Sequence, residues 1–231
     1  MVRNKRLILG IIGLFILLSP KDSFCAPCYG TRLPQKNGFV IGIQNHTVFR
    51  RKLEKDYGKL RSMQNFILLS YGLKDWFSLD LKGGAGYIKQ HPLNNAEIDY
   101  STGFAGGYGF RLKLYDQNNK RLVFGFQHIS VHPKKSYFDG IKNQAILDDW
   151  QGSFLASYDI LKITPYLGFK YSRMDYIHKE NNQRKRKMSD LTKIFGLVVG
   201  LDYNIDQHNW FNLEVQFFDS KTCAFSVNHS F

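Results

Sequence analysis

The chain has 231 residues, with 32 Lys and Arg against 19 Asp and Glu, giving a formal net charge of +13 at pH 7. Its length suits one domain, and the absence of a sequence repeat or an appended helical region excludes repeat and multidomain architectures. A basic balance raises nucleic acid as a partner. Because the charge gathers in connecting segments of a chain that starts with a secretion signal, we expect anionic lipid as the partner and no nucleic acid.

The first 25 residues are typical of a signal peptide. Basic residues precede an apolar run from Leu7 to Leu18, which is short for a membrane span, and Ser23 and Cys25 suit cleavage before Ala26. An uncleaved N-terminal anchor is the alternative. The mature chain then starts with a short lead, 26–36, ahead of the first strand.

Two cysteines remain if Cys25 leaves with the signal. Cys28 precedes the first expected strand and Cys223 starts the last one. The topology derived below places them at opposite membrane surfaces, so we expect no disulfide between them even in an oxidising compartment.

Apolar and polar residues alternate with period two through most of the mature chain. In Phe195–Tyr203 the odd positions are Phe, Leu, Val, Leu and Tyr, while the even positions include Gly and Asp. Such a strand has one apolar face and one small or polar face, and about nine residues suffice for a tilted strand to cross a bilayer. The ten segments with this pattern are 38–49, 62–72, 76–88, 100–114, 121–131, 147–158, 163–176, 191–204, 210–218 and 222–231.

These segments predict an all-β fold, a transmembrane antiparallel β-barrel of about ten strands over residues 37–231. The polar faces carry residues such as Gln44, Lys82 and Arg111, which are unsuited to the core of a soluble sandwich. A soluble barrel of the lipocalin kind is the alternative. It would require the Phe-rich faces to turn inward and the charged faces outward.

The connections alternate between short turns and long polar loops. The short ones are expected near 73–75, 116–120, 159–162 and 205–209, and most of the others are longer. This is the pattern of bacterial outer-membrane barrels, whose short turns face the periplasm, and an even strand number places both termini on that side.

The interior of a ten-stranded barrel is narrow. Asp80, Lys82, Arg111 and Glu214 lie on inward faces and are expected to pair across it, while the glycines between 103 and 109 are expected to leave some room. A large diffusion pore is therefore excluded, and a narrow channel is one of three functional hypotheses.

The last strand ends in an alternating pattern with a terminal aromatic residue, Phe231. This resembles the signature that bacterial outer-membrane proteins present to their assembly machinery. The resemblance implies the bacterial outer membrane as the location and the barrel-assembly machinery as a partner.

One strand carries polar groups on its lipid-facing side. Alternation places His128, Ser130 and His132 on the face of Phe124 and Phe126, near the outer leaflet. Polar groups on a lipid-facing surface need a reason. Contact with lipid headgroups is the simplest one. A metal site is disfavoured, because the two histidines lie about 13 Å apart along a strand.

His128-Ile129-Ser130 resembles the His-x-Ser element of the lipid A 3-O-deacylase and of outer-membrane phospholipase A. The resemblance implies Ser130 as nucleophile and His128 as its base, with calcium and dimerisation as further requirements if the chain is a phospholipase. Asp148 is the candidate that would orient the imidazole. If Leu122 lies opposite Ala156, an antiparallel register places Ser130 opposite Asp148.

The first functional hypothesis is a non-catalytic envelope protein without a cofactor. Its basic loops would contact lipopolysaccharide or an external partner, and they comprise Arg50, Arg51, Lys52, Arg184, Lys185, Arg186 and Lys187. The second hypothesis is a lipid acyl hydrolase of the outer leaflet that uses Ser130, His128 and Asp148.

Overall fold

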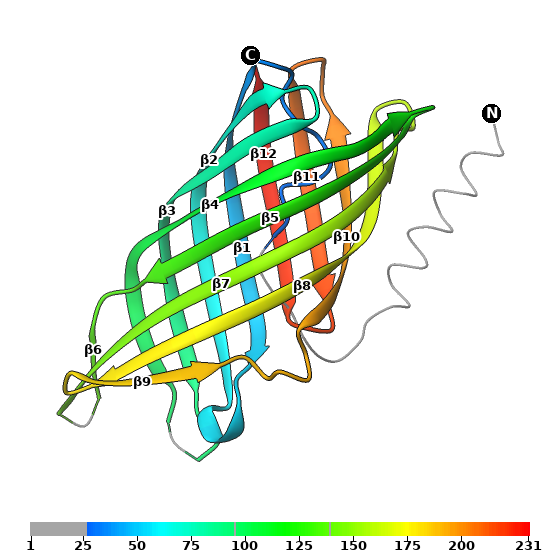
Figure 1. The fold of residues 1–231 in the computed structure, drawn as a ribbon. Coiled ribbons are helices and arrows are strands. Elements are labelled where there is room, and N and C mark those ends of the chain that lie inside the picture. The colour runs from blue at the N-terminus through cyan, green and yellow to red at the C-terminus, as the bar shows by residue number, and fades with distance from the viewer. Residues whose placement is uncertain (1–26, 95, 139) are drawn as a thin grey trace.

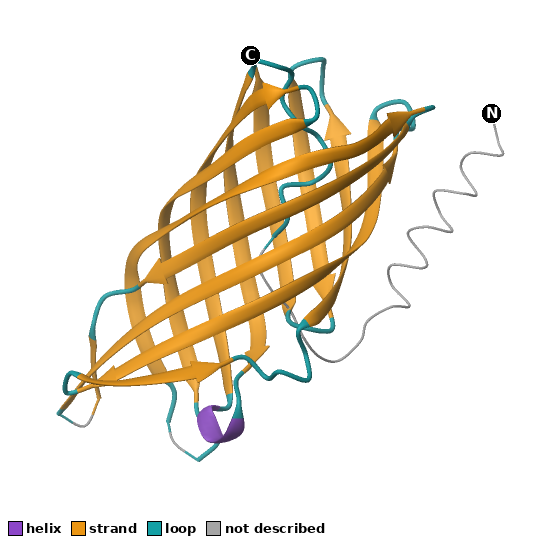
Figure 2. Cartoon of the chain, in the orientation of Figure 1, coloured by secondary structure: helices purple, strands orange, loops and turns teal. Residues whose placement is uncertain are grey.

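A computed structural model describes residues 27–94, 96–138 and 140–231 of the chain; the expected signal peptide lies outside them. The strands are β1 (Phe39–Lys52), β2 (Lys59–Lys74), β3 (Phe77–His91), β4 (Ile98–Gln117), β5 (Lys120–His132), β6 (Ser136–Phe138), β7 (Ile141–Tyr158), β8 (Ile163–Glu180), β9 (Gln183–Met188), β10 (Phe195–Asn204), β11 (Asn209–Phe217) and β12 (Lys221–Ser230). A 3-10 turn, η1 (Lys55–Tyr57), lies between β1 and β2 (Figure 2). No helix within the described ranges has the length and apolarity that a membrane span requires.

Ten of the described strands form a closed antiparallel barrel (Figure 1). The neighbours run β7-β5-β4-β3-β2-β1-β12-β11-β10-β8, and the pairing of β7 with β8 closes the ring. The short strands β6 and β9 extend β7 and β8 at one end. The ten expected strands are therefore confirmed, although β7 already begins at Ile141.

Short turns gather at one end of the barrel, at 75–76, 118–119, 159–162 and 205–208. The chain also ends there, where Phe231 N donates to Phe39 O. In the turn of β4 and β5, Asn118 and Asn119 have φ values of 54° and 62°, as a two-residue type I′ hairpin requires. We call this the periplasmic end, because short turns of such barrels face the periplasm.

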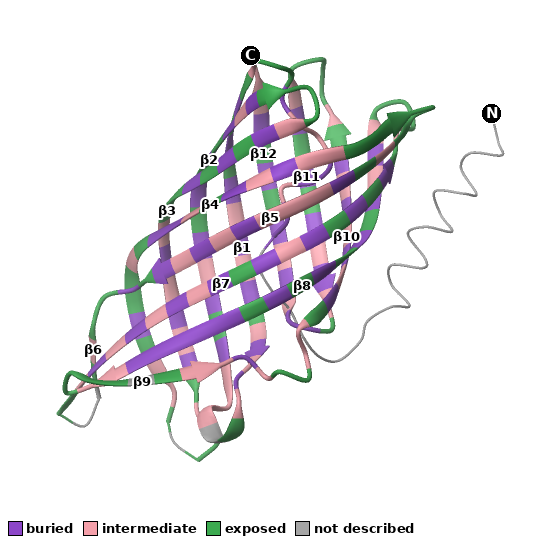
Figure 3. Cartoon of the chain, viewed as in Figure 1, coloured by how far each residue is buried: buried purple, intermediate pink, exposed green. Residues whose placement is uncertain are grey.

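The two faces of each strand differ in burial as alternation predicts (Figure 3). Large apolar side chains such as Ile43, Phe169 and Phe195 are exposed on the outside. Polar side chains such as Gln44 and Lys170 are buried inside. An apolar outside and a polar inside are the reverse of a soluble barrel's distribution, which rules out the lipocalin alternative.

The N-terminal lead lies inside the barrel. Lys82 Nζ and Gln127 Nε2 donate to Pro27 O at 3.4 and 2.6 Å, and Cys28 N donates to Glu214 Oε1 at 2.7 Å. The expectation that Cys28 lies at the periplasmic surface is therefore wrong, because inward-facing polar groups bind the backbone of the lead. Cys28 and Cys223 are both free in the structure.

Arg111 is the main link between the wall and the lead. Its guanidinium binds Asp80 in a bidentate ion pair, with Nη2–Oδ1 at 2.7 Å and Nε–Oδ2 at 2.9 Å. Its Nη1 also donates to the carbonyl oxygens of Tyr29 (3.0 Å) and Arg32 (2.6 Å). The expected pairing of inward charges is confirmed for these two residues, and it holds the lead as well.

The extracellular half of the interior holds an apolar cluster beside buried polar side chains such as Arg51 and Asp149. Members of the cluster include Leu60, Phe66, Ile88, Ile129, Leu147 and Tyr176. Three pockets between the described interior residues have volumes of about 20, 10 and 20 Å³, which is space for single water molecules. Packed side chains and the N-terminal lead thus occupy the interior.

Glycines on the inner face of β4 contribute no free space. A Cβ at Gly103, Gly107 or Gly109 would lie 2.2, 2.5 or 2.3 Å from a carbonyl oxygen of β5. The room expected from these glycines is therefore taken up by the close approach of the neighbouring strand.

β9 completes the wall at the extracellular end. β10, β11 and β12 are short and do not reach as far toward the extracellular end as β8 does. In its extracellular part, β8 pairs with β9 in place of β10. The end of β9 reaches the end of β1 through a bridge between Leu53 and Ser189 and a bond from Glu54 N to Met188 O at 3.0 Å. The basic run of 184–187 is therefore part of the wall.

Candidate functional site

The lipid-facing polar cluster lies where β5 and β7 pair. Leu122 lies opposite Ala156, and the same antiparallel register places Ser130 opposite Asp148. The register expected from the sequence is thus confirmed. Alternation requires only that both apolar faces lie on the same side of the sheet, and the structure selects this register among those that satisfy it.

Aromatic residues surround His128. It pairs with Trp150 across the strands, with 4.1 Å between the ring centroids, and Tyr108 lies on its other side at 5.3 Å. Trp and Tyr are enriched where the bilayer meets water. This row therefore marks the outer interface, and Ser130 lies one step further toward the extracellular end.

Ser130 contacts two of its neighbours. Its Oγ lies 2.5 Å from Asp148 Oδ1 and 2.7 Å from His132 Nε2. His128 approaches Asp148 instead, with Nε2 at 3.7 Å from Oδ1. Ser130, His128 and Asp148 are thus brought together, but the imidazole that contacts the serine is that of His132.

The single hydroxyl proton of Ser130 cannot serve both contacts. If it lies on the bond to an ionised Asp148, His132 must donate from Nε2 to the serine oxygen. If it lies toward His132, that imidazole is placed as a base within hydrogen-bond reach. The geometry therefore allows two hydrogen-bond arrangements, which differ in the position of one proton.

Asp148 belongs to a charged row that crosses β8 and β9. It lies opposite Asp175, whose carboxylate forms an ion pair with Arg186. The hydrogen bond to Asp175, with a smaller contribution from the charge of Asp148, raises the pKa of Arg186. One residue of the basic run is therefore tied electrostatically to the polar cluster.

The seven basic residues singled out in the sequence have different environments. Arg184 and Arg186 are exposed, and Arg50, Lys52 and Lys187 are half-buried. The side chain of Lys185 is outside the described part.

Arg51 lies inside the barrel, where its Nη1 contacts Asp219 Oδ2 at 3.2 Å. It is 1% exposed. A shift in the β1 register after Val48 separates it from its neighbour Arg50, so it faces away from the lipid that it was expected to contact.

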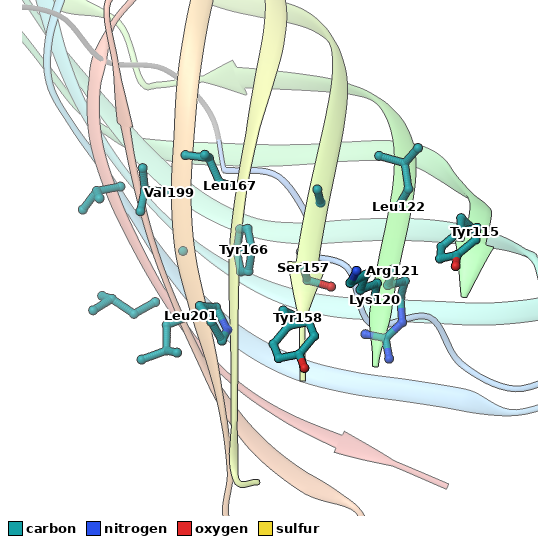
Figure 4. Close-up of a pocket in the computed structure, with 15 residues that line it drawn as sticks. Tyr115, Lys120, Arg121, Leu122, Ser157, Tyr158, Tyr166, Leu167, Val199 and Leu201 are labelled. Atoms are coloured by element: carbon teal, nitrogen blue, oxygen red, sulfur yellow. The ribbon is translucent and has the colours of Figure 1, made fainter. Parts of the chain in front are cut away.

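A second feature of the outer wall is a hollow of about 990 Å³ toward the periplasmic end (Figure 4). Its lining is almost entirely apolar and includes Leu122, Ala156, Leu167, Val199, Leu201 and Leu213. These residues face outward on adjacent strands, and the small side chain of Ala156 leaves space between its larger neighbours. The hollow presents a largely apolar surface to the membrane, and Lys120, Arg121 and Ser157 also belong to its lining.

Within the described ranges, no group of three His, Cys, Asp or Glu residues is arranged to hold a metal ion. His128 and His132 each contact a different partner of the cluster.

His132 is the functional candidate that sequence reasoning underused. The His-x-Ser resemblance directed attention to His128, although the pattern His-x-Ser-x-His places an imidazole on each side of the serine. Both neighbours share its face, and only side-chain rotamers decide which one reaches the hydroxyl.

Comparisons with known proteins give distant likenesses. No family model and no curated protein matches the sequence. Among solved structures, Ail from Yersinia pestis is 9% identical over 85% of this chain and 100% of its own, with a TM-score of 0.42. The transport unit of the autotransporter AIDA-I from Escherichia coli is 12% identical over 90% and 92%, at 0.43. The outer membrane protease OmpT from Escherichia coli is 11% identical over 84% and 94%, at 0.41.

The barrel's own architecture assigns its location. Ten antiparallel strands close on themselves, short turns gather at one end, and the outside is apolar. This combination is that of bacterial outer-membrane proteins. The chain is an integral β-barrel of the outer membrane.

Proposed function

We propose that this barrel engages anionic lipid of the outer leaflet, above all lipopolysaccharide, through basic groups at its extracellular end and without catalysing a reaction. The observation that carries the proposal is the position of β9. It pairs with β8 and holds Arg184 and Arg186 exposed on the wall of the barrel. Arginine suits this role because its planar guanidinium binds phosphate oxygens in pairs.

Binding of purified lipopolysaccharide to the folded barrel in a non-ionic detergent tests this proposal. Arg184→Ala is expected to weaken binding about tenfold, the loss typical of one charge-assisted hydrogen bond. Lys74→Ala, at the periplasmic end, is the matched control. Equal affinities of wild type and Arg184→Ala would exclude this contact, and would leave an external protein as the partner to test.

Other partners are part of the same proposal. Phe231 is exposed at the periplasmic end, where the assembly machinery would meet it. The occupied interior favours a role at the protein surface and disfavours the narrow-channel hypothesis. A surface role requires no cofactor.

A lipid acyl hydrolase is the second candidate, favoured by the contact between Ser130 Oγ and His132 Nε2. In the first step, the serine oxygen would bond to the ester carbonyl carbon and its proton would pass to the imidazole. The bond from that carbon to the alcohol oxygen breaks, and the alcohol leaves with the proton. Water then attacks the acyl-serine by the same route, which frees the fatty acid and restores the hydroxyl.

For this reaction the hydroxyl of Ser130 must turn from Asp148 to His132. Arg186, which is ion-paired with Asp175, contributes a positive charge near Asp148. Gly106 lies opposite Ser130 on β4, and the ring of Phe104 lies over it. Calcium belongs to this candidate only, as a requirement carried over from phospholipases.

Release of fatty acid from phospholipid and from lipid A, with and without calcium, tests the second candidate. Release that disappears in Ser130→Ala would establish the hydrolase and its nucleophile. Absence of release from folded protein would leave the cluster as a headgroup contact.

A further inference from the structure

Four basic residues from three chain segments meet at the extracellular rim, far from Ser130 around the barrel. Arg50 of β1 lies directly opposite Lys221 of β12. Lys52 follows on β1, and Lys193 lies in the connection between β9 and β10. We call these four residues the rim cluster. All four side chains are half-buried.

Backbone bonds hold the segments of the rim cluster together. Asp190 N donates to Lys52 O at 3.3 Å, and Lys193 N donates to Asp190 O at 2.9 Å. Lys193 is thereby folded back toward β1. Partial burial, followed by the nearby charges of Lys52 and Arg50, lowers the pKa of Lys193.

The acidic residues nearby have other partners. Asp219, in the turn before Lys221, points into the barrel and binds both Arg51 (3.2 Å) and Lys170 (2.9 Å). Asp190 accepts bonds from Thr192 N at 3.0 Å and from its Oγ1 at 2.6 Å, although its charge also acts on Lys193. The four cations of the rim cluster outnumber Glu54, Asp190 and Asp219, the acidic residues within three positions of them in the chain. Like charges placed directly opposite each other destabilise a strand pair.

Exposed apolar side chains lie beside the rim cluster on the outer wall. Phe49, Phe195 and Phe218 are 54%, 70% and 58% exposed. Phe49 precedes Arg50 on β1, and Phe218 precedes Asp219 in the turn before Lys221. The surface thus joins cations to an apolar patch at the level of the outer leaflet, and an amphiphile with an anionic head matches both parts.

We propose that the rim cluster binds a phosphate group of an outer-leaflet glycolipid, the lipid A part of lipopolysaccharide, whose acyl chains lie on Phe49, Phe195 and Phe218. The inference rests on the proposed function and gives it a second, separate site. Two of its four cations, Lys193 and Lys221, were not candidates in the sequence. A phosphate placed between the cations would remove the repulsion that the lipid-free rim carries.

Lipid A binding to the full folded chain in non-ionic detergent tests the proposal, with thermal unfolding measured in parallel. Lys193→Gln and Lys52→Gln are each expected to weaken binding of bisphosphorylated lipid A about tenfold. Each is also expected to raise the unfolding temperature of the lipid-free protein, because it removes a repulsion. Opposite effects on binding and stability cannot come from misfolding. Lys74→Gln is the control.

The source of the phosphate is distinguished by two further ligands. Dephosphorylated lipid A is expected to lose most of the affinity, and inorganic phosphate is expected to bind far more weakly than lipid A. Equal affinity for both forms of lipid A, or tighter binding of inorganic phosphate, would overturn the proposal.

Arg184→Ala separates the two proposals. If it weakens lipid binding while Lys193→Gln and Lys52→Gln do not, the rim cluster is wrong and the proposed function stands. If the wild type binds no lipopolysaccharide, both fail.

Discussion

Ser130 and Asp148 lie opposite each other on β5 and β7, with the hydroxyl oxygen 2.5 Å from the carboxylate on the membrane-facing side. In a Ser-His-Asp triad the carboxylate orients the imidazole and the imidazole alone contacts the serine. Here the carboxylate reaches the serine directly and His132 contacts it from the other side. The order of the three groups therefore differs from that expected for Ser130, His128 and Asp148.

The two histidines should differ in their effect on any acyl hydrolase activity. His132→Gln is expected to lower fatty-acid release by about 100-fold or more, because it removes the base that touches the serine. His128→Gln is expected to have a much smaller effect, since His128 stacks on Trp150. Initial rates on lipid micelles measure both, and the reverse order would restore His128 as the base.

Arg111 is expected to be essential for stability. Arg111→Ala leaves Asp80 as an unpaired buried carboxylate, which costs about 3–5 kcal/mol of unfolding free energy. Asp80→Leu combined with Arg111→Met is expected to recover only part of this loss, because the carbonyl groups of Tyr29 and Arg32 still lack their donor. Urea unfolding of the barrel in lipid vesicles measures both variants, and a loss below about 1 kcal/mol in Arg111→Ala would contradict the role given to the pair.

The N-terminal lead should control ion flow. The full chain is expected to show little conductance in planar bilayers, because the buried part of the lead and packed side chains occupy the interior. A variant that lacks 27–36 is expected to conduct more. Thr31→Ala, which loses a single bond to Ser157, is the control and should behave as the wild type. Large conductance in the full chain would instead support the channel hypothesis.

Two adjacent glycines of β3 should tolerate alanine differently. A Cβ at Gly83 meets no atom within 4 Å, whereas a Cβ at Gly84 would lie 1.9 Å from the backbone oxygen of Asn65. Gly84→Ala is therefore expected to destabilise the barrel by about 1–3 kcal/mol, and Gly83→Ala to be neutral or slightly stabilising. Unfolding midpoints provide the comparison, and equal values would show that β2 and β3 can move apart.

Thiol labelling should locate the lead in the folded protein. Cys28 is 2% exposed, so a water-soluble maleimide is expected to label it only after unfolding. Cys223→Ser leaves Cys28 as the reporter among the described cysteines. Fast labelling of that variant in the folded state would place the lead outside the barrel.

The alternating pattern was sufficient for the strands and their faces. Phe124, Phe126 and Trp150 mark the outward side of β5 and β7, and a shift of one residue would turn all of them inward. Alternation places Ser130 and Asp148 on the same face, but a shift by two residues would keep every face, so their opposition was predicted only on the condition that Leu122 lies opposite Ala156. Local periodicity also separates Gln44 and Lys170 from the lipid, since each lies between outward apolar residues.

The tertiary structure alone decided what fills the barrel, how its rim closes and which imidazole meets the serine. Polar groups from several strands bind the backbone of the lead, and such binding does not depend on its side chains. The sequence of residues 27–36 therefore carries no pattern that marks it as an internal segment. The inward turn of Arg51 depends on a register shift and on Asp219, which is distant in sequence. The rim cluster likewise forms because β9 crosses to β1 and brings Lys193 beside Lys52. Periodicity encodes the face of each residue, whereas contacts between distant segments depend on closure of the whole sheet.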